Sequence, residues 1–238
     1  MKEHIVRKTI ISMIILLLFF FMQGAIAVVN NLGGAQSACI RGAVIWALVL
    51  FTVVFYFIRY RDLTLLGFRK PKEESYKKSI FYIPLIVIAL SNLVCGVDTS
   101  YGAGFIFANL FLTLGIGFAE EIYFRGIICN LWEDRGVKKA VAVSAILFGV
   151  CHLMNVLGGA GIAETILQIC FALLYGIVVS LIFIRSKSIW PCIILHAFHD
   201  FCSFISCDGT LQLNIIIGII QFIILLWYAV FLSKRIRA

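Results

Sequence analysis

Seven ionisable side chains lie within long apolar stretches of the sequence, where a charged group is costly. A charge at the centre of a membrane-spanning helix is disfavoured by about 2.5 to 3.5 kcal/mol, so such residues usually face a protein interior and mark function. Acids and imidazoles in one place can transfer protons, activate water or bind a metal. The sequence therefore predicts a single buried polar site, formed by Glu120, Glu121, Arg125, His152, His196, His199 and Asp200.

Residues 119–126 place two acids and one base on a single predicted helix. Glu120 and Glu121 are separated by about 100° around a helix axis, so their carboxylates point in different directions. Glu121 and Arg125 are four residues apart with the acid first, a spacing that favours an ion pair. Glu120 is then the acid without a local partner, which makes it the candidate general base. In the alternative, both glutamates only link helices through hydrogen bonds.

Histidines occur on two further apolar segments. His152 stands alone at the end of residues 148–152 and taken by itself resembles a hydrogen-bonded core residue. His196 and Asp200 are four residues apart on one face of a predicted helix, and His199 flanks them. A histidine with a carboxylate one turn away suits an oriented base, an oxyanion donor or a metal ligand, and the spacing leaves these roles open.

Hydrophobic helices are the elements that must position these residues. Hydrophobic residues make up 62% of the 238 residues and charged residues 13%, against about 25% charged in an average soluble domain. Apolar stretches long enough to cross a bilayer as helices recur along the chain, without the alternation of barrel strands. The predicted fold is all-α, a polytopic membrane bundle that forms a single membrane domain over residues 1–238. We expect about eight transmembrane helices, at 9–29, 41–58, 79–96, 104–131, 139–154, 164–184, 189–206 and 211–232.

The positive charges predict the orientation of this bundle. With residue 1 in the cytoplasm, the cytoplasmic loops are 59–78, 132–139 and 185–188, and these loops and the two tails hold 18 of the 20 Lys and Arg residues. This distribution matches the positive-inside rule and predicts that both termini are cytoplasmic. Because the bases lie between hydrophobic runs, the net charge of +8 does not indicate nucleic-acid binding. The apolar part of the longest loop, residues 63–68, could lie on anionic membrane lipid, or the loop could only set the topology.

The motifs EExxxR, FxxxH and HxxxD, in this order on successive hydrophobic helices, resemble the CPBP family. This family comprises CAAX prenyl protease 2 and the bacteriocin-processing membrane peptidases, also called the Abi family. The resemblance covers about residues 119–200, within a predicted catalytic core at 104–206. It implies an intramembrane endopeptidase that acts on a peptide or a lipidated protein. It also implies roles for the site residues: Glu120 and His152 bind and deprotonate water, His196 and Asp200 stabilise the oxyanion, and Glu121 and Arg125 give support, with His199 as a further supporting residue.

One residue departs from the family pattern. The eukaryotic prenyl proteases resemble the pattern with asparagine as its last member, whereas this chain has Asp200. An ionised aspartate cannot donate a hydrogen bond to an oxyanion, so Asp200 is protonated, orients His196, or belongs to a metal site. Glu120, His152 and His196 would make a reasonable three-ligand zinc site with one position open for water. We expect glutamate-activated water without an obligatory cofactor, and keep one zinc ion as the alternative.

Two other functions would also require buried polar groups. A non-catalytic membrane immunity or scaffold protein could use them to fix helix packing, and a proton-coupled transporter could use them as an ion pathway. Against transport, the sequence shows no inverted repeat. For the peptidase, a site about 15 to 20 Å from the basic face by helical rise suits a peptide tail that enters from the cytoplasm. Compact loops fit a bacterial plasma membrane, where a leader peptide or membrane-bound peptide is the expected substrate.

Overall fold

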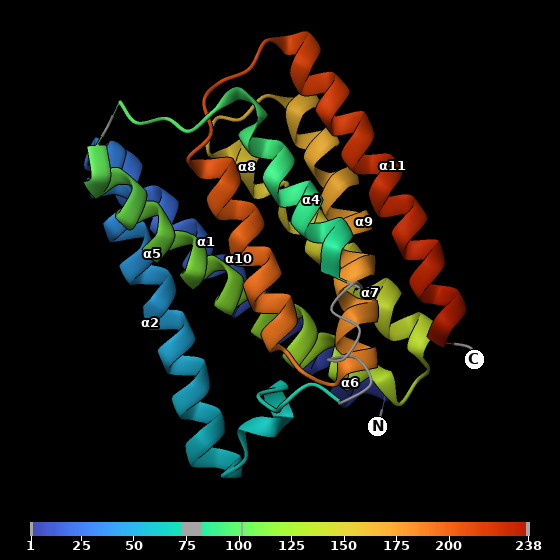
Figure 1. The fold of residues 1–238 in the computed structure, drawn as a ribbon. Coiled ribbons are helices and arrows are strands. Elements are labelled where there is room, and N and C mark those ends of the chain that lie inside the picture. The colour runs from blue at the N-terminus through green and yellow to red at the C-terminus, as the bar shows by residue number, and fades with distance from the viewer. Residues whose placement is uncertain (1, 73–81, 101, 237–238) are drawn as a thin grey trace.

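The computed structural model describes residues 2–72, 82–100 and 102–236 of the chain. Within these residues the regular structure is helical, apart from one isolated bridge between Val97 and Ser206. This confirms the predicted all-α fold. The helices run up and down as one bundle (Figure 1), in the order α1 (Lys2–Val29), α2 (Gly34–Tyr60), η1 (Leu63–Leu66), α4 (Ile83–Ser91), η3 (Asn92–Cys95), α5 (Gly102–Glu121), η4 (Ile122–Cys129), α6 (Asn130–Glu133), α7 (Val137–Cys151), α8 (Met154–Leu157), α9 (Ile162–Ser186), α10 (Trp190–Phe204) and α11 (Leu211–Ile236).

Six helical segments of the described chain are long and apolar enough to cross a membrane, which makes the protein a multi-pass integral membrane protein. The third and seventh of the eight predicted spans are shorter than predicted. The third ends where Gly96 adopts a φ of 92°, and its predicted start at 79–81 lies outside the described residues. The seventh, α10, has 15 residues, or about 22 Å of helix, against a hydrocarbon core of about 30 Å.

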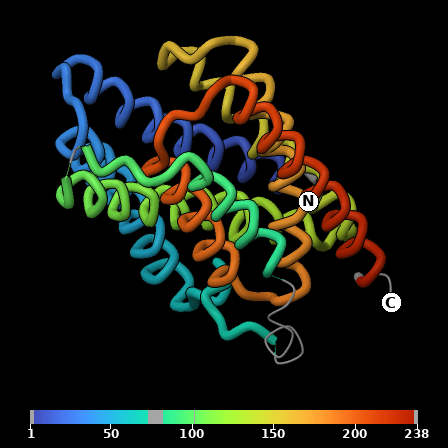
Figure 2. The backbone as a smooth tube through the Cα atoms, turned by 45° about the horizontal axis from the view of Figure 1, so that its top comes forward, coloured from blue at the N-terminus to red at the C-terminus, as the bar shows by residue number. Residues whose placement is uncertain are grey.

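The positively charged loops gather at one end of the bundle. Helix α1 begins and α11 ends at this end, and the loops that follow α2, α6 and α9 lie there as well (Figures 1 and 2). We call it the basic end, and the end at which α1 finishes and α9 begins the opposite end. Because α1 begins and α11 ends at the same end of the bundle, the chain crosses the bundle an even number of times. The distribution of Lys and Arg in the sequence predicts the same.

The loop after α2 packs against the protein at the basic end. Leu66 is fully buried, the backbone N–H of Ile189 donates to the carbonyl of Gly67 over 2.9 Å, and Asn130 donates to the carbonyl of Leu65 over 3.0 Å. These contacts dock residues 63–68 on the bundle, so a topology-setting loop describes them better than a segment that lies on lipid. The remainder of the predicted loop, at 73–78, lies outside the described residues.

Small residues bring together the helices that carry the site. A methyl group added at Gly117 of α5 would lie 3.0 Å from Cβ of Ala197 in α10, so the two helices are nearly in backbone contact there. Gly176 of α9 lies equally close to α7, where an added methyl group would be 3.1 Å from Cα of Ala145. Small residues at helix interfaces allow this close approach in membrane proteins. His196, which is next to Ala197 on α10, is therefore held close to Glu121, which lies one turn beyond Gly117 on α5.

Candidate active site

The helix that carries the two glutamates changes its geometry directly after them. Residues 104–131 were expected to form one helix, but α5 gives way to the π-helical segment η4 at Ile122, all eight residues of which are buried. Such wider turns are rare and frequently occur at functional sites. The predicted ion pair is present: Nη1 of Arg125 lies 2.9 Å from Oε1 of Glu121, and both side chains are fully buried. Arg125 also donates to the carbonyl of Gly176 over 3.3 Å.

His196 reaches the same ion pair from α10. Its Nδ1 lies 2.7 Å from Oε1 of Glu121, the oxygen that Arg125 also contacts. Because Glu121 is paired with a cation, its carboxylate acts as the acceptor and Nδ1–H of His196 as the donor. From the sequence we predicted a contact of Glu121 with Arg125 only. The structure gives Glu121 a second contact, through which it fixes the orientation of the His196 ring.

The other ring nitrogen of His196 faces two further carboxylates. Nε2 lies 3.7 Å from Oε2 of Glu120 and 3.5 Å from Oδ2 of Asp200. Both distances are longer than an ordinary N–H···O hydrogen bond of about 2.9 Å. The side chains of Glu120 and Asp200 are 13% and 19% exposed, and Oε2 of Glu120 is buried without a hydrogen-bond partner among the described residues. Nε2 is therefore directed at the space between two acids.

His199 lies on the far side of Asp200. Its Nδ1 is 3.4 Å from Oδ1 of Asp200, and its ring stacks on Phe171 of α9 with centroids 5.3 Å apart. Tyr175, one turn further along α9, has its ring centroid 5.6 Å from those of both His196 and His199. The sequence did not single out Tyr175, because an isolated tyrosine in an apolar helix carries no distinctive spacing. Both α9 aromatics hold the imidazoles of α10 in place.

His152 occupies a different position from the one predicted. Residues 139–154 were expected to form one helix, but α7 ends at Cys151 and His152 is its capping residue. Its Nδ1 lies 3.0 Å from the carbonyl oxygen of Phe148, and because a carbonyl only accepts, Nδ1 carries the proton and Nε2 remains an acceptor. The Phe148 ring lies between the imidazoles, with centroids 5.2 Å from His152 and 5.6 Å from His196. Among the described residues no hydrogen bond or ion pair joins His152 to Glu120.

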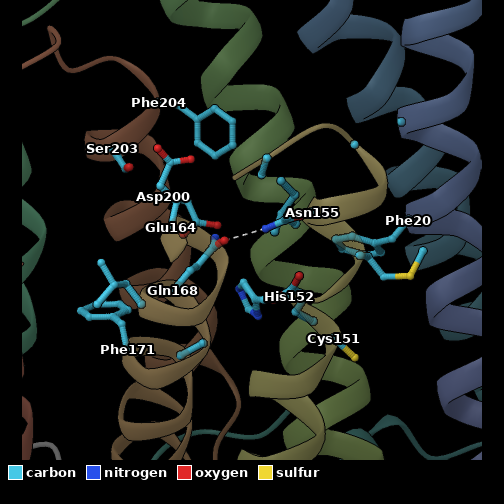
Figure 3. A pocket seen from close by; sticks show the side chains of 18 of the residues that line it. Phe20, Cys151, His152, Asn155, Glu164, Gln168, Phe171, Asp200, Ser203 and Phe204 are labelled. Carbon is cyan, nitrogen blue, oxygen red and sulfur yellow. Dashed lines mark hydrogen bonds between the residues drawn. The ribbon is translucent and has the colours of Figure 1, made fainter. Parts of the chain in front are cut away.

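A cavity of about 1840 Å³ connects these residues, and its wall includes Glu120, His152, His196, His199 and Asp200. Figure 3 shows His152 and Asp200 in its wall, with Asn155 and Gln168 joined by a 2.7 Å hydrogen bond.

The cavity extends toward the opposite end of the bundle. Its wall contains the second half of α1, the first half of α9, α8 and the first half of α11, and no described residue of the basic loops. The expectation that the site is approached from the basic face is therefore not met, because η4 and the second half of α9, on the basic side of the site, consist mostly of buried residues.

The predicted zinc ligands are not arranged as a metal site. Across residues 2–72, 82–100 and 102–236, no group of three or more His, Cys, Asp or Glu side chains could hold a metal ion. His196 uses Nδ1 for Glu121 and His152 uses Nδ1 for a carbonyl, which leaves Nε2 of each ring as the nitrogen that could bind a metal. The zinc alternative stays a prediction that this placement of side chains does not support.

Comparison with known families gives one match. Residues 102–202 match the sequence model of the family described as Rce1-like, type II CAAX prenyl endopeptidase. The matched segment begins with α5 and ends within α10, and it contains all seven ionisable residues of the predicted site. No curated protein and no solved structure matches the chain.

Proposed function

Since the chain belongs, through residues 102–202, to the Rce1-like family of type II CAAX prenyl endopeptidases, we propose that it hydrolyses a peptide bond inside the membrane with water activated by Glu120. A peptidase of this family takes a peptide or a protein as its substrate. The finer assignments, namely the residues that act, the absence of an obligatory metal and a membrane-associated or lipidated tail as substrate, are our proposal.

One observation supports Glu120 as the general base. Its Oε2 is buried without a hydrogen-bond partner among the described residues, and Glu120 is one of the residues in the wall of a large cavity. Buried polar atoms are nearly always satisfied by protein or by ordered water. A water bound to the Glu120 carboxylate would lie near Nε2 of His196, which is 3.7 Å from Oε2. An acid that holds water next to a hydrogen-bond donor has what a hydrolytic site needs.

The proposed reaction conserves its protons. Glu120 accepts a proton from the bound water as the oxygen of that water attacks the scissile carbonyl carbon. The tetrahedral intermediate then collapses, the C–N bond breaks, and Glu120 returns the proton to the leaving amine. His152, whose Nε2 remains an acceptor, receives a hydrogen bond from the attacking water and orients it.

His196 supplies the donor for the oxyanion. With both ring nitrogens protonated, Nδ1–H donates to Glu121 and Nε2–H points into the space between Glu120 and Asp200. Asp200 stays ionised and orients the two histidines, because its oxygens face Nδ1 of His199 and Nε2 of His196. In this proposal the oxyanion needs no donor at position 200, where the eukaryotic pattern has asparagine.

We also propose that the basic end faces the cytoplasm of a bacterium and contacts anionic lipid, with no nucleic-acid partner. Support comes from the 18 Lys and Arg residues in the tails and in the predicted cytoplasmic loops. A fluorescent reporter that folds only in the cytoplasm, fused after residue 238, should then be bright. A dark fusion together with an active periplasmic reporter would reverse this orientation.

The peptidase proposal is tested by Glu120→Gln in purified protein reconstituted into vesicles. We expect it to lose cleavage of membrane-associated peptides by at least about a hundredfold, while its unfolding temperature stays close to that of the unchanged protein. Glu133→Gln is the matched control, because Glu133 lies at the basic end and pairs with Lys187 outside the cavity. Full cleavage by Glu120→Gln would remove the catalytic role and favour the immunity or scaffold function. Proton uptake into the vesicles without cleavage would favour transport.

A further inference from the structure

Two carboxamide side chains in the wall of the cavity form a pair that the proposed reaction does not use. Nδ2 of Asn155, in α8, donates to Oε1 of Gln168, in α9, over 2.7 Å. Both residues line the cavity, and Figure 3 shows the bond between them. We call Asn155 and Gln168 the amide pair.

The amide pair lies about one helical turn from the imidazoles of the site, on the side of the opposite end. Asn155 follows His152 by three residues, and its backbone N–H donates to the carbonyl of His152 over 3.0 Å. Gln168 precedes Phe171 by three residues and Tyr175 by seven, so these three side chains share one face of α9. The rings of Phe171 and Tyr175 pack against the imidazoles of α10. A chain that enters the cavity from the opposite end therefore passes the amide pair next to the imidazoles.

The bond within the amide pair leaves one polar atom of each side chain for a ligand. Oδ1 of Asn155 and Nε2 of Gln168 have no hydrogen-bond partner among residues 2–72, 82–100 and 102–236. The first is an acceptor and the second is a donor. A peptide main chain carries the complementary groups, one N–H and one C=O at each residue.

A peptide bound in this part of the cavity needs such partners. It gives up water on entry, and each of its main-chain groups that stays without a hydrogen bond costs free energy. The carboxylate of Glu164, one turn before Gln168, already accepts from the backbone N–H of Gly161 over 3.2 Å. The other wall residues of α7, α8 and α9 around the amide pair are mostly apolar: Cys151, Met154, Leu157, Leu167 and Phe171.

We propose that Asn155 and Gln168 bind the main chain of the substrate within about two residues of the scissile bond, Asn155 by accepting from an N–H and Gln168 by donating to a C=O. One helical turn is about 5.4 Å, and an extended peptide advances about 3.3 to 3.6 Å per residue, which gives this separation. The inference rests on the proposed peptidase function and adds two substrate-binding residues to it. Recognition of the main chain makes binding at these positions independent of the substrate side chains.

The test compares two probes on the Glu120→Gln protein in phosphatidylcholine vesicles. One is the peptide acetyl-(Ala-Leu)4-amide, and the other is a depsipeptide with the same side chains, in which ester oxygens replace the main-chain N–H groups. Binding is measured as the rise in unfolding temperature, each variant against its own value without probe. The peptide should bind about tenfold more tightly, because the depsipeptide has no N–H for Oδ1 of Asn155.

Two leucine variants separate binding from a structural bridge between α8 and α9, since both remove the bond within the amide pair. Asn155→Leu should abolish the preference for the peptide. Gln168→Leu keeps Oδ1 of Asn155, so it should weaken both probes and retain most of the preference. Gln212→Leu is the matched control, because Gln212 is an exposed glutamine of α11 that does not line the cavity.

Three results would overturn the proposal: equal responses to the two probes, a preference that survives Asn155→Leu, or a preference that both leucine variants abolish equally. The last result would leave the amide pair as a structural bridge. The binding measurement does not require turnover, so its failure is distinct from failure of the proposed function. Cleavage that persists in Glu120→Gln would contradict the role of Glu120 and leave the binding result unchanged.

Discussion

Nδ1 of His196 lies 2.7 Å from Oε1 of Glu121, and this contact joins α10 to α5 at the centre of the bundle. The same oxygen lies 2.9 Å from Nη1 of Arg125. A fully buried carboxylate is thus shared between a permanent cation and the histidine that faces the cavity. Glu121 is a positioning residue, because it orients His196 without lining the cavity itself.

Glu121→Gln should separate this positioning role from a purely structural one. The amide cannot form the ion pair, and breaking a buried pair costs about 3 to 5 kcal/mol of stability. It should also leave the His196 ring misplaced, which lowers kcat by about a hundredfold with little change in KM. Steady-state cleavage and thermal unfolding of the reconstituted protein would measure both effects. An unchanged kcat in a destabilised protein would restrict Glu121 to a structural role.

Asp200→Asn tests whether the carboxylate at position 200 acts as an acceptor. Asparagine keeps the shape of the side chain and an oxygen that can accept from His199, so we expect cleavage to fall by less than about tenfold. Asp200→Ala removes the acceptor and should cost about a hundredfold, because His196 loses its orientation. The cleavage rates of the two variants, compared at equal amounts of folded protein, decide the question. A rate for Asp200→Asn above that of the unchanged protein would show that a donor is needed there.

The ion pair and the convergence of the acids and imidazoles could be predicted from sequence, because both depend on the cost of charge in a membrane. The i, i+4 spacing of Glu121 and Arg125 survives the change to π-helix geometry. The apolar stretches likewise predicted the order of the helices and an all-α bundle.

Contacts between helices could not be predicted, because they depend on how the helices rotate against one another. The bond from His196 to Glu121 joins residues 75 positions apart. Helix α7 ends at Cys151 although mostly apolar residues follow at 153–157, so hydrophobicity alone does not mark its end. We predicted from the charge of the loops that the site opens toward the basic end. The cavity instead extends toward the opposite end, and the buried residues of α9 and η4 close the basic end.

Chelation should leave cleavage unchanged. The mechanism that we propose draws its base from Glu120 and its oxyanion donor from His196, and it takes no step through a metal. Protein dialysed against EDTA should therefore cleave as fast as untreated protein, and elemental analysis should find substoichiometric zinc. Loss of cleavage on chelation, restored by zinc and not by magnesium, would instead support the ligand set Glu120, His152 and His196.

Gly117→Ala tests the packing that holds the site together. The new methyl group would lie 3.0 Å from Cβ and 3.1 Å from the backbone nitrogen of Ala197, the residue after His196. We expect α10 to move away from α5 by a few tenths of an ångström and cleavage to fall by about tenfold, since the geometry of His196 against Glu121 is disturbed. Gly104→Ala is the matched control on α5, because open space surrounds Gly104. Alanine favours a helix over glycine by about 1 kcal/mol, so both variants should remain folded in a thermal unfolding measurement. Equal activity of the two variants would show that this close approach does not set the geometry of the site.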